Sequence, residues 1–125
     1  MASVKKPILV VDDDPFILDI VSRYLERKGY RVLAITDPEN AYRLAEKEQP
    51  QLMICDVAMP GLDGFSLFQQ FKLQPTTKNI PWVLLTGSDK LKDIEKAFAL
   101  GAQGYLIKPV DWTTAWPKIE PLLKE

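Results

Sequence analysis

Short apolar runs alternate along this chain with longer segments in which apolar residues recur every three or four positions. A short run without polar alternation is typical of a strand buried on both faces, and the longer spacing is typical of amphipathic helices. Strands are predicted at 8–11, 30–35, 52–55, 81–86 and 103–107. Because a helical segment follows each strand, the pattern predicts an α/β doubly wound sandwich with a five-stranded parallel sheet.

The helical segments carry start and stop signals. Asp14 precedes Pro15 and is interpreted as an N-cap. The next helix starts at a proline in the same way, with Asp37 or Thr36 as its cap. Gly29 and Gly101 follow the last residues of two helical segments and are expected to end them. The first helix is predicted from the helical spacing of Ile17, Ile20, Val21, Tyr24 and Leu25.

The last helical segment is interrupted by prolines. Its apolar spacing starts at Trp112, but Pro117 and Pro121 fall within it. An interior proline costs roughly 3 kcal/mol or more. One way to avoid this cost is a helix that begins near Thr114, which puts Pro117 in its first turn. Pro121 is still expected to kink or end the helix. Trp112 and Trp116 fit either a packed helix or an exposed interaction face, and we favour packing.

Composition narrows the classes of function. The chain has 125 residues, enough for one domain with a sizeable core. Its formal net charge of −1 gives no reason to expect direct binding of nucleic acid or of a membrane surface, and no apolar stretch is long enough to span a bilayer. Residues 1–6 are polar, lack the apolar core of a signal peptide and are expected to be flexible.

Cysteine and histidine usage narrows the classes further. A single cysteine, Cys55, excludes an internal disulfide and suits a reducing compartment, so we expect a cytoplasmic protein. Cys55 itself is interpreted as a small core residue. The chain has no histidine, which excludes a serine–histidine triad and the usual zinc ligand.

Polar side chains stand at the carboxyl ends of four predicted strands. Asp12 and Asp13 follow the first, Asp56 the third, Thr86 ends the fourth, and Lys108 follows the fifth. Parallel strands end at one edge, where open α/β sheets bind ligands. Three carboxylates there repel each other, and the lysine and a divalent cation would relieve that repulsion. Such oxygen ligands suit Mg²⁺, and the site suits phosphoryl transfer with Asp56 as the nucleophile.

Each of these residues has an ordinary structural explanation when taken alone. An aspartate or threonine at a strand end often forms a turn, and a lysine is usually solvated. The functional interpretation rests on their joint occurrence at the ends of different strands.

Four segments of the chain resemble the receiver (CheY-like) domain of bacterial two-component response regulators. They occur in that family's order and spacing, at residues 10–14, 56–64, 84–87 and 101–109. The resemblance implies a flavodoxin-like (βα)5 fold and a single receiver domain over residues 1–125. The chain ends about where a receiver ends, so no output domain is expected within it. Whether it acts alone or was cut from a longer protein stays open.

The resemblance also implies roles for the residues at the sheet edge. The aspartate matching Asp56 accepts a phosphoryl group from the phosphohistidine of a histidine kinase or a histidine phosphotransfer protein. Asp12, Asp13 and Asp56 match the side chains that hold Mg²⁺, together with the backbone carbonyl of Ala58. Lys108 matches the lysine that pairs with a phosphoryl oxygen.

Two further residues match the family's switch. Thr86 corresponds to the threonine that moves to the phosphoryl group, and Tyr105 to the aromatic residue that swings inward behind it; Tyr105 also fits a plain core residue. The face formed by the fourth helix, the fifth strand and the fifth helix would then bind a downstream effector protein. The resemblance also allows a homodimer that forms on phosphorylation.

The chain departs from the family pattern after Thr86. Gly87 stands where the family more often has alanine, and glycine leaves that position open. Ala58 and Ser88 are small, so neither is expected to shield an acyl phosphate strongly. We therefore expect a phosphorylated state that is not unusually long-lived.

Two other classes fit less well. A magnesium-dependent phosphotransferase or phosphatase would need a further acid/base carboxylate beside Asp56, and Val57 and Ala58 cannot serve. A nucleotide-binding module would need a phosphate loop rich in glycine, serine or threonine after the first strand, where three aspartates stand instead. We therefore expect a signalling switch that acts on its own aspartate, and no enzyme for outside substrates.

Overall fold

The computed structural model describes residues 6–57, 64–87 and 91–123. Of the start that is predicted to be flexible, only Lys6 lies in this part of the chain, and it is exposed. No helix of the described residues is long and apolar enough to cross a bilayer. The strands and helices are β1 (Ile8–Val11), α1 (Pro15–Arg27), β2 (Val32–Ile35), α2 (Ala41–Glu48), β3 (Leu52–Asp56), α3 (Gly64–Leu73), β4 (Trp82–Thr86), α4 (Leu91–Ala99), β5 (Gly104–Ile107) and α5 (Trp112–Ile119).

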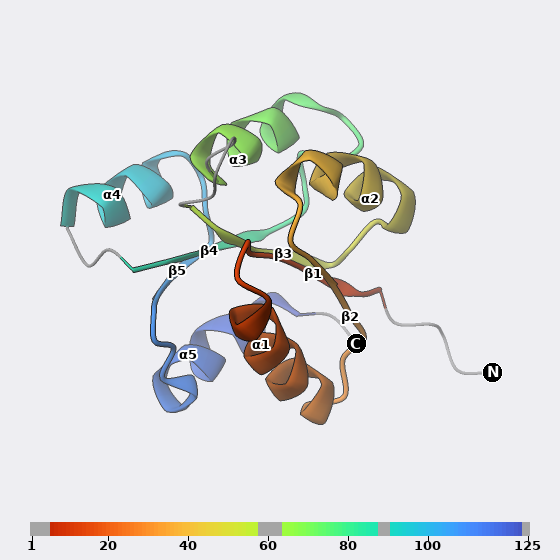
Figure 1. Ribbon diagram of the computed structural model, residues 1–125. Helices are drawn as coiled ribbons and strands as arrows, with labels where there is room; N and C mark the ends of the chain where they lie inside the picture. Colours follow the sequence, from red (N-terminus) through yellow and green to blue (C-terminus); the bar gives the residue numbers. More distant parts are fainter. Residues whose placement is uncertain (1–5, 58–63, 88–90, 124–125) are drawn as a thin grey trace.

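All strand pairs are parallel, and the strand order is β2-β1-β3-β4-β5. Helices α1 and α5 cover one face of the sheet, and α2, α3 and α4 cover the other (Figure 1). The predicted doubly wound sandwich is therefore confirmed. The order reverses between β1 and β3, and the crevice at such a switch point is where α/β sheets of this kind bind ligands.

Each strand contributes side chains to two hydrophobic clusters, because successive residues of a strand point to opposite faces of the sheet. Ile8 and Val10 lie in the cluster beneath α1 and α5, whereas Leu9 and Val11 lie in the cluster beneath α2, α3 and α4. This double burial is the reason that the strands read as unbroken apolar runs in the sequence.

Most predicted helix ends are confirmed. The Asp14 carboxylate accepts a hydrogen bond from the Phe16 amide at 2.9 Å and caps α1. Gly29 and Gly101 follow α1 and α4 with φ angles of 94° and 103°, in the left-handed region that glycine tolerates.

The helix predicted from the apolar spacing after Pro15 is confirmed as α1, but not every residue of that pattern is buried. Ile20 is 41% exposed, whereas Leu18 is buried with Val21 and Leu25. Ile17 and Tyr24 are partly buried against the same cluster.

The predicted start of the last helix is wrong. Helix α5 begins at Trp112 instead of near Thr114, because the Asp111 carboxylate accepts a hydrogen bond from the Thr113 amide at 3.0 Å and forms an N-cap. Pro117 consequently lies inside the helix, on its exposed side. The expected end is confirmed, because a 3-10 turn that contains Pro121 follows Ile119.

Candidate functional site

The pairing of the strands brings the predicted polar residues to one edge. The register of β1 against β3 makes Asp12 and Asp56 neighbours. The Lys108 amide donates a hydrogen bond to the Thr86 carbonyl at 2.7 Å, which joins the ends of β5 and β4. The carboxyl ends of β1, β3, β4 and β5 therefore lie together at the edge where the site was predicted.

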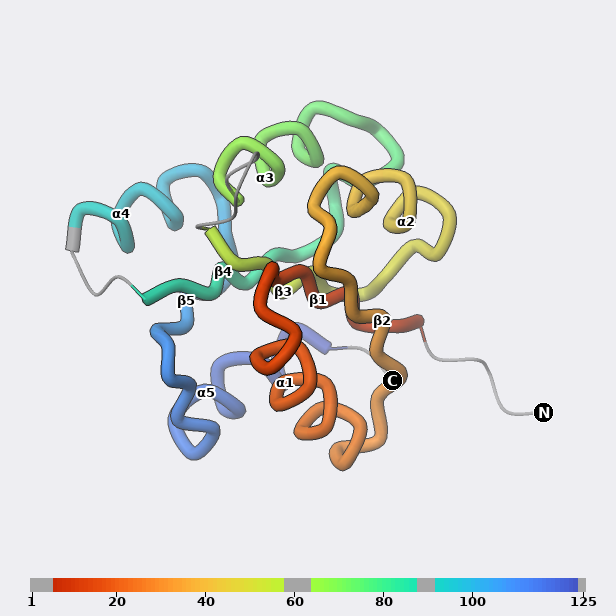
Figure 2. The backbone as a smooth tube through the Cα atoms, in the orientation of Figure 1, coloured from red at the N-terminus to blue at the C-terminus, as the bar shows by residue number. Residues whose placement is uncertain are grey.

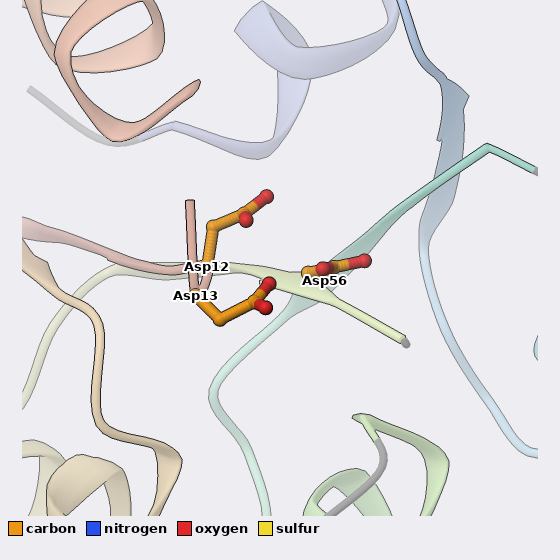
Figure 3. A group of neighbouring side chains, drawn as sticks. All are labelled: Asp12, Asp13 and Asp56. Carbon is orange, nitrogen blue, oxygen red and sulfur yellow. The ribbon is translucent and has the colours of Figure 1, made fainter. Parts of the chain in front are cut away.

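Three carboxylates lie together at this edge. Asp12 is fully buried, Asp56 is 3% exposed and Asp13 is exposed. Each offers one carboxylate oxygen, and these oxygens lie within 4.8 Å of one another (Figure 3). Asp12 Oδ1 accepts a hydrogen bond from the Asp14 amide at 2.9 Å, which fixes the side chain. Three oxygen ligands this close fit a hard divalent cation that keeps some of its waters, as Mg²⁺ does. Ala58, the predicted carbonyl ligand, lies outside the described residues.

Lys108 supplies the positive charge. Its Nζ lies 2.8 Å from Asp12 Oδ2 and 3.4 Å from Asp56 Oδ2. Burial alone would lower the pKa of Lys108, but the close contact with Asp12 and the negative charges of Asp56 and Asp12 outweigh it, so the pKa is raised. Lys108 is therefore an ammonium at neutral pH. It compensates two carboxylates whose burial without a partner would be costly.

Thr86 and Tyr105, the two predicted switch residues, lie in different surroundings. Thr86 is 3% exposed at the end of β4. A Cβ built on the next residue, Gly87, would meet nothing within 4 Å, so the predicted open position is confirmed. Tyr105 is 8% exposed, and its ring belongs to the core cluster beneath α2, α3 and α4. Ser88, the other predicted small neighbour, lies outside the described residues.

Gly64 supports the site in a way that sequence reasoning missed. A Cβ at this position would lie 2.4 Å from the Asp56 carbonyl oxygen and 2.7 Å from Val57 Cα. The Gly64 amide donates a hydrogen bond to the Val57 carbonyl at 2.8 Å. The first residue of α3 therefore packs directly against the end of β3. The available signal was a glycine at a helix start, which often marks a close backbone approach.

Cys55 is a core residue, as predicted. It is fully buried beside Asp56 and is the free cysteine of the chain. Burial, and to a smaller extent the charges of Asp56 and Asp12, raise the pKa of the Cys55 thiol. A buried thiol of this kind is inert.

Comparisons with known proteins agree with this geometry. Residues 8–118 match the family model described as "Response regulator receiver domain". The chain is 34% identical to protein PilH of Pseudomonas aeruginosa over 116 residues, which are 93% of this chain and 96% of that protein. It is 37% identical to the DNA-binding dual master transcriptional regulator RpaA of Synechocystis sp. over 94% of this chain, but spans only 48% of that regulator.

Solved structures show the same fold. The chemotaxis response regulator CheY4 of Vibrio cholerae superimposes with a TM-score of 0.86 at 30% identity, over 96% of this chain and 100% of that one. The chain spans about half the length of several curated relatives that it matches, such as RpaA, and nearly all of others, such as PilH. The family match covers most of the chain, and the chain accordingly belongs to the response regulator receiver domains of two-component signalling systems.

Proposed function

We propose that Asp56 is the residue of this receiver that accepts the phosphoryl group, with Lys108 beside it. The observation that carries this assignment is the position of Asp56. It is 3% exposed on the central strand, and its Oδ2 lies 3.4 Å from the Lys108 ammonium. It also shares a space with Asp12 and Asp13 in which one carboxylate oxygen of each lies within 4.8 Å of the others.

The proposed reaction follows from these groups. An Asp56 carboxylate oxygen forms a bond to the phosphorus atom, while the bond from phosphorus to a donor histidine nitrogen breaks and its electrons leave with the imidazole. Lys108 offsets the charge on the phosphoryl oxygens. Mg²⁺, when held by Asp12, Asp13, Asp56 and the Ala58 carbonyl, supplies further charge compensation. The chain acts on its own aspartate, and we propose no outside substrate.

We further propose that Thr86 and Tyr105 form the switch. Thr86 ends β4 at the same edge as Asp56, and the open position at Gly87 leaves room for its segment to move. Tyr105 lies on β5 and pairs with Leu84 of the neighbouring strand β4. A displacement of the end of β4 would therefore be passed to Tyr105 through the pairing of these two strands. A local change of charge that biases a two-state element is the usual basis of such switches.

The phosphodonor is proposed to dock beside α1, where apolar side chains border Lys108. Phe16 is 68% exposed and Ile20 is 41% exposed. An adjoining cavity of about 150 Å³ is lined by Ile17, Ile20, Val21, Lys108, Pro109, Val110 and Trp112. Because Lys108 lines this cavity and also contacts Asp56, a protein seated here would bring its phosphohistidine to the site. A histidine kinase or a histidine phosphotransfer protein fits this requirement.

The effector is proposed to bind the face formed by α4, β5 and α5, which we call the output face. Phe98 of α4 and Ile107 of β5 are 49% and 40% exposed. A hollow of about 320 Å³ runs along β5 and α5, between Tyr105 and Lys118. Exposed apolar side chains with a hollow beside them suit a protein partner. A second copy of this chain at the same face would appear as a homodimer after phosphorylation. The free, buried Cys55 suits the cytoplasm as the place of action.

Intact mass spectrometry after incubation with acetyl phosphate and Mg²⁺ tests the assignment. We expect the native chain to gain one phosphoryl group and Asp56→Asn to gain none. The gain should also disappear when Mg²⁺ is chelated. Asp14→Asn is the matched control: it removes a nearby carboxylate that caps α1, and its mass gain should match that of the native chain. A phosphoryl group on Asp56→Asn would refute the assignment.

A further inference from the structure

The two helices of the output face are held in unequal ways. On one side, α5 is joined to α1 by the rings of Tyr24 and Trp112, which stack with centroids 4.2 Å apart and 10° between their planes. Trp116 adds ring contacts at 5.9 Å to Tyr24 and at 6.1 Å to Tyr30. Lys28 Nζ lies 5.2 Å from the Trp116 ring. Because such contacts stabilise beyond the area they bury, α5 is fixed firmly to α1.

On the other side, α4 has a light attachment. Among its described side chains only the small Ala97 is fully buried, Ile94 is partly buried, and Phe98 is 49% exposed. The Lys96 ammonium lies 4.4 Å from the centroid of the Phe65 ring, which belongs to α3. Helices α3 and α4 lie next to each other on the same face of the sheet (Figure 2). The contact between Lys96 and Phe65 therefore spans two helices.

Phe65 lies close in the chain to Asp56, and Lys96 lies on α4, the helix that follows Thr86. Phe65 follows Gly64, whose backbone packs against the carbonyl of Asp56. The contact thus joins the segment that is fixed to Asp56 with the segment that leads away from Thr86.

We propose that the contact between Lys96 and Phe65 is a latch that holds α4 against α3 in the unphosphorylated chain, and that this contact opens when Asp56 is phosphorylated. The second half of this statement rests on the proposed function. An exposed contact between a cation and a ring shifts a two-state equilibrium by about two- to five-fold. The latch is therefore weak enough for phosphorylation of Asp56 to release.

Hydrogen exchange of the unphosphorylated chain, measured without Mg²⁺, tests the latch itself. We expect Lys96→Gln to speed amide exchange in α4 by about two- to five-fold and to leave α5 unchanged. Lys72→Gln is the matched control, because Lys72 Nζ lies 5.3 Å over the ring of Phe68 within the same helix, α3. Unchanged exchange in Lys96→Gln, or an equal increase in Lys72→Gln, would overturn the latch.

A double-mutant cycle separates the contact from other effects of the substitutions. Phe65→Leu removes the ring and keeps an apolar side chain. If the latch is correct, Lys96→Gln has no further effect on α4 exchange in the Phe65→Leu background. Full additivity of the two substitutions would show that Lys96 acts without Phe65.

Phosphorylation tests whether the latch opens. Lys96→Gln raises the population of the released state of α4, so if that state is the one that reacts, phosphorylation by acetyl phosphate should be up to about five-fold faster, while Lys72→Gln should have no such effect. Amide exchange in α4 should become faster on phosphorylation of the native chain and should gain little more in phosphorylated Lys96→Gln; an equal further increase in that variant would show that phosphorylation leaves the latch closed. A native chain that takes no phosphoryl group would refute the proposed function, whereas the exchange of the unphosphorylated variants still decides the latch.

Discussion

Gly64 is the first residue of the helix that follows β3, and Gly87 directly follows β4. The space around these two glycines differs. A side chain at position 64 would meet the backbone of Asp56, while one at position 87 would meet nothing within 4 Å. Backbone atoms cannot turn aside as a flexible side chain can. Two glycines that look alike in the sequence therefore have opposite tolerance for substitution.

We expect Gly64→Ala to destabilise the fold by about 3 kcal/mol, because α3 must shift away from the end of β3 to avoid overpacking. The same shift should slow phosphorylation of Asp56 by at least about ten-fold, since a 1 Å displacement of reacting groups has large effects on rate. Urea unfolding followed by circular dichroism measures the first effect, and mass gain with acetyl phosphate the second. Gly87→Ala is the control and should fold within about 0.5 kcal/mol of the native chain. Equal stability of the two variants would contradict the role of Gly64.

At the scale of elements, α5 shows how far local sequence signals reach. Pro121 correctly predicted where the helix ends. The start was missed because the Asp111 cap and the stacking of Trp112 on Tyr24 outweigh the cost of Pro117 inside the helix. A contact with a different helix is not readable from the spacing of apolar residues. The preference for packing over an exposed interaction face is confirmed for Trp112 and Trp116, which are both half-buried against α1.

Trp116→Ala should destabilise the fold by about 2 kcal/mol, less than for a fully buried tryptophan, because the ring is half-buried and loses its contacts with Tyr24 and Tyr30. For a domain of this size, that change lowers the thermal midpoint by roughly 8 °C. Differential scanning calorimetry measures it. Leu73→Ala, at a side chain that is 81% exposed, should leave the midpoint nearly unchanged. A Trp116→Ala midpoint equal to that of Leu73→Ala would show that the aromatic contacts do not hold α5.

At the scale of the whole molecule, the architecture was predictable and part of the site was not. Alternating strands and helices with short connections leave few topologies open, and parallel strand ends then bring Asp12, Asp56 and Lys108 together. The contact of Gly64 with the end of β3 and that of Lys96 with Phe65 depend on how helices lie against the sheet and each other. Such details are fixed by packing in three dimensions and carry no periodic signal.

Cys55 offers a measurement of whole-molecule stability. It is fully buried in the central strand, so a thiol reagent should label it only when the domain unfolds. If Mg²⁺ binds the folded chain as proposed, Mg²⁺ at 100 times its Kd should add about 2.7 kcal/mol to the free energy of unfolding and slow labelling roughly 100-fold. Asp13→Asn, which alters an exposed member of the carboxylate group, should weaken this effect of Mg²⁺. Labelling of Cys55 that is faster than unfolding, or that is not slowed by Mg²⁺ in the native chain, would contradict these expectations.

The three clustered carboxylates should also make the binding of an anionic phosphodonor depend on ionic strength. Three carboxylates and one ammonium leave two formal negative charges at the edge of the sheet. An anionic donor is repelled by that field over about 10 Å at 0.1 M salt, whereas a divalent cation at the site cancels it. The binding of small anionic donors should therefore strengthen with added salt when the site is metal-free, and it should become nearly independent of salt when a divalent cation is held there. A divalent cation held by Asp12, Asp13 and Asp56 would therefore remove the repulsion of an anionic donor before any chemistry takes place.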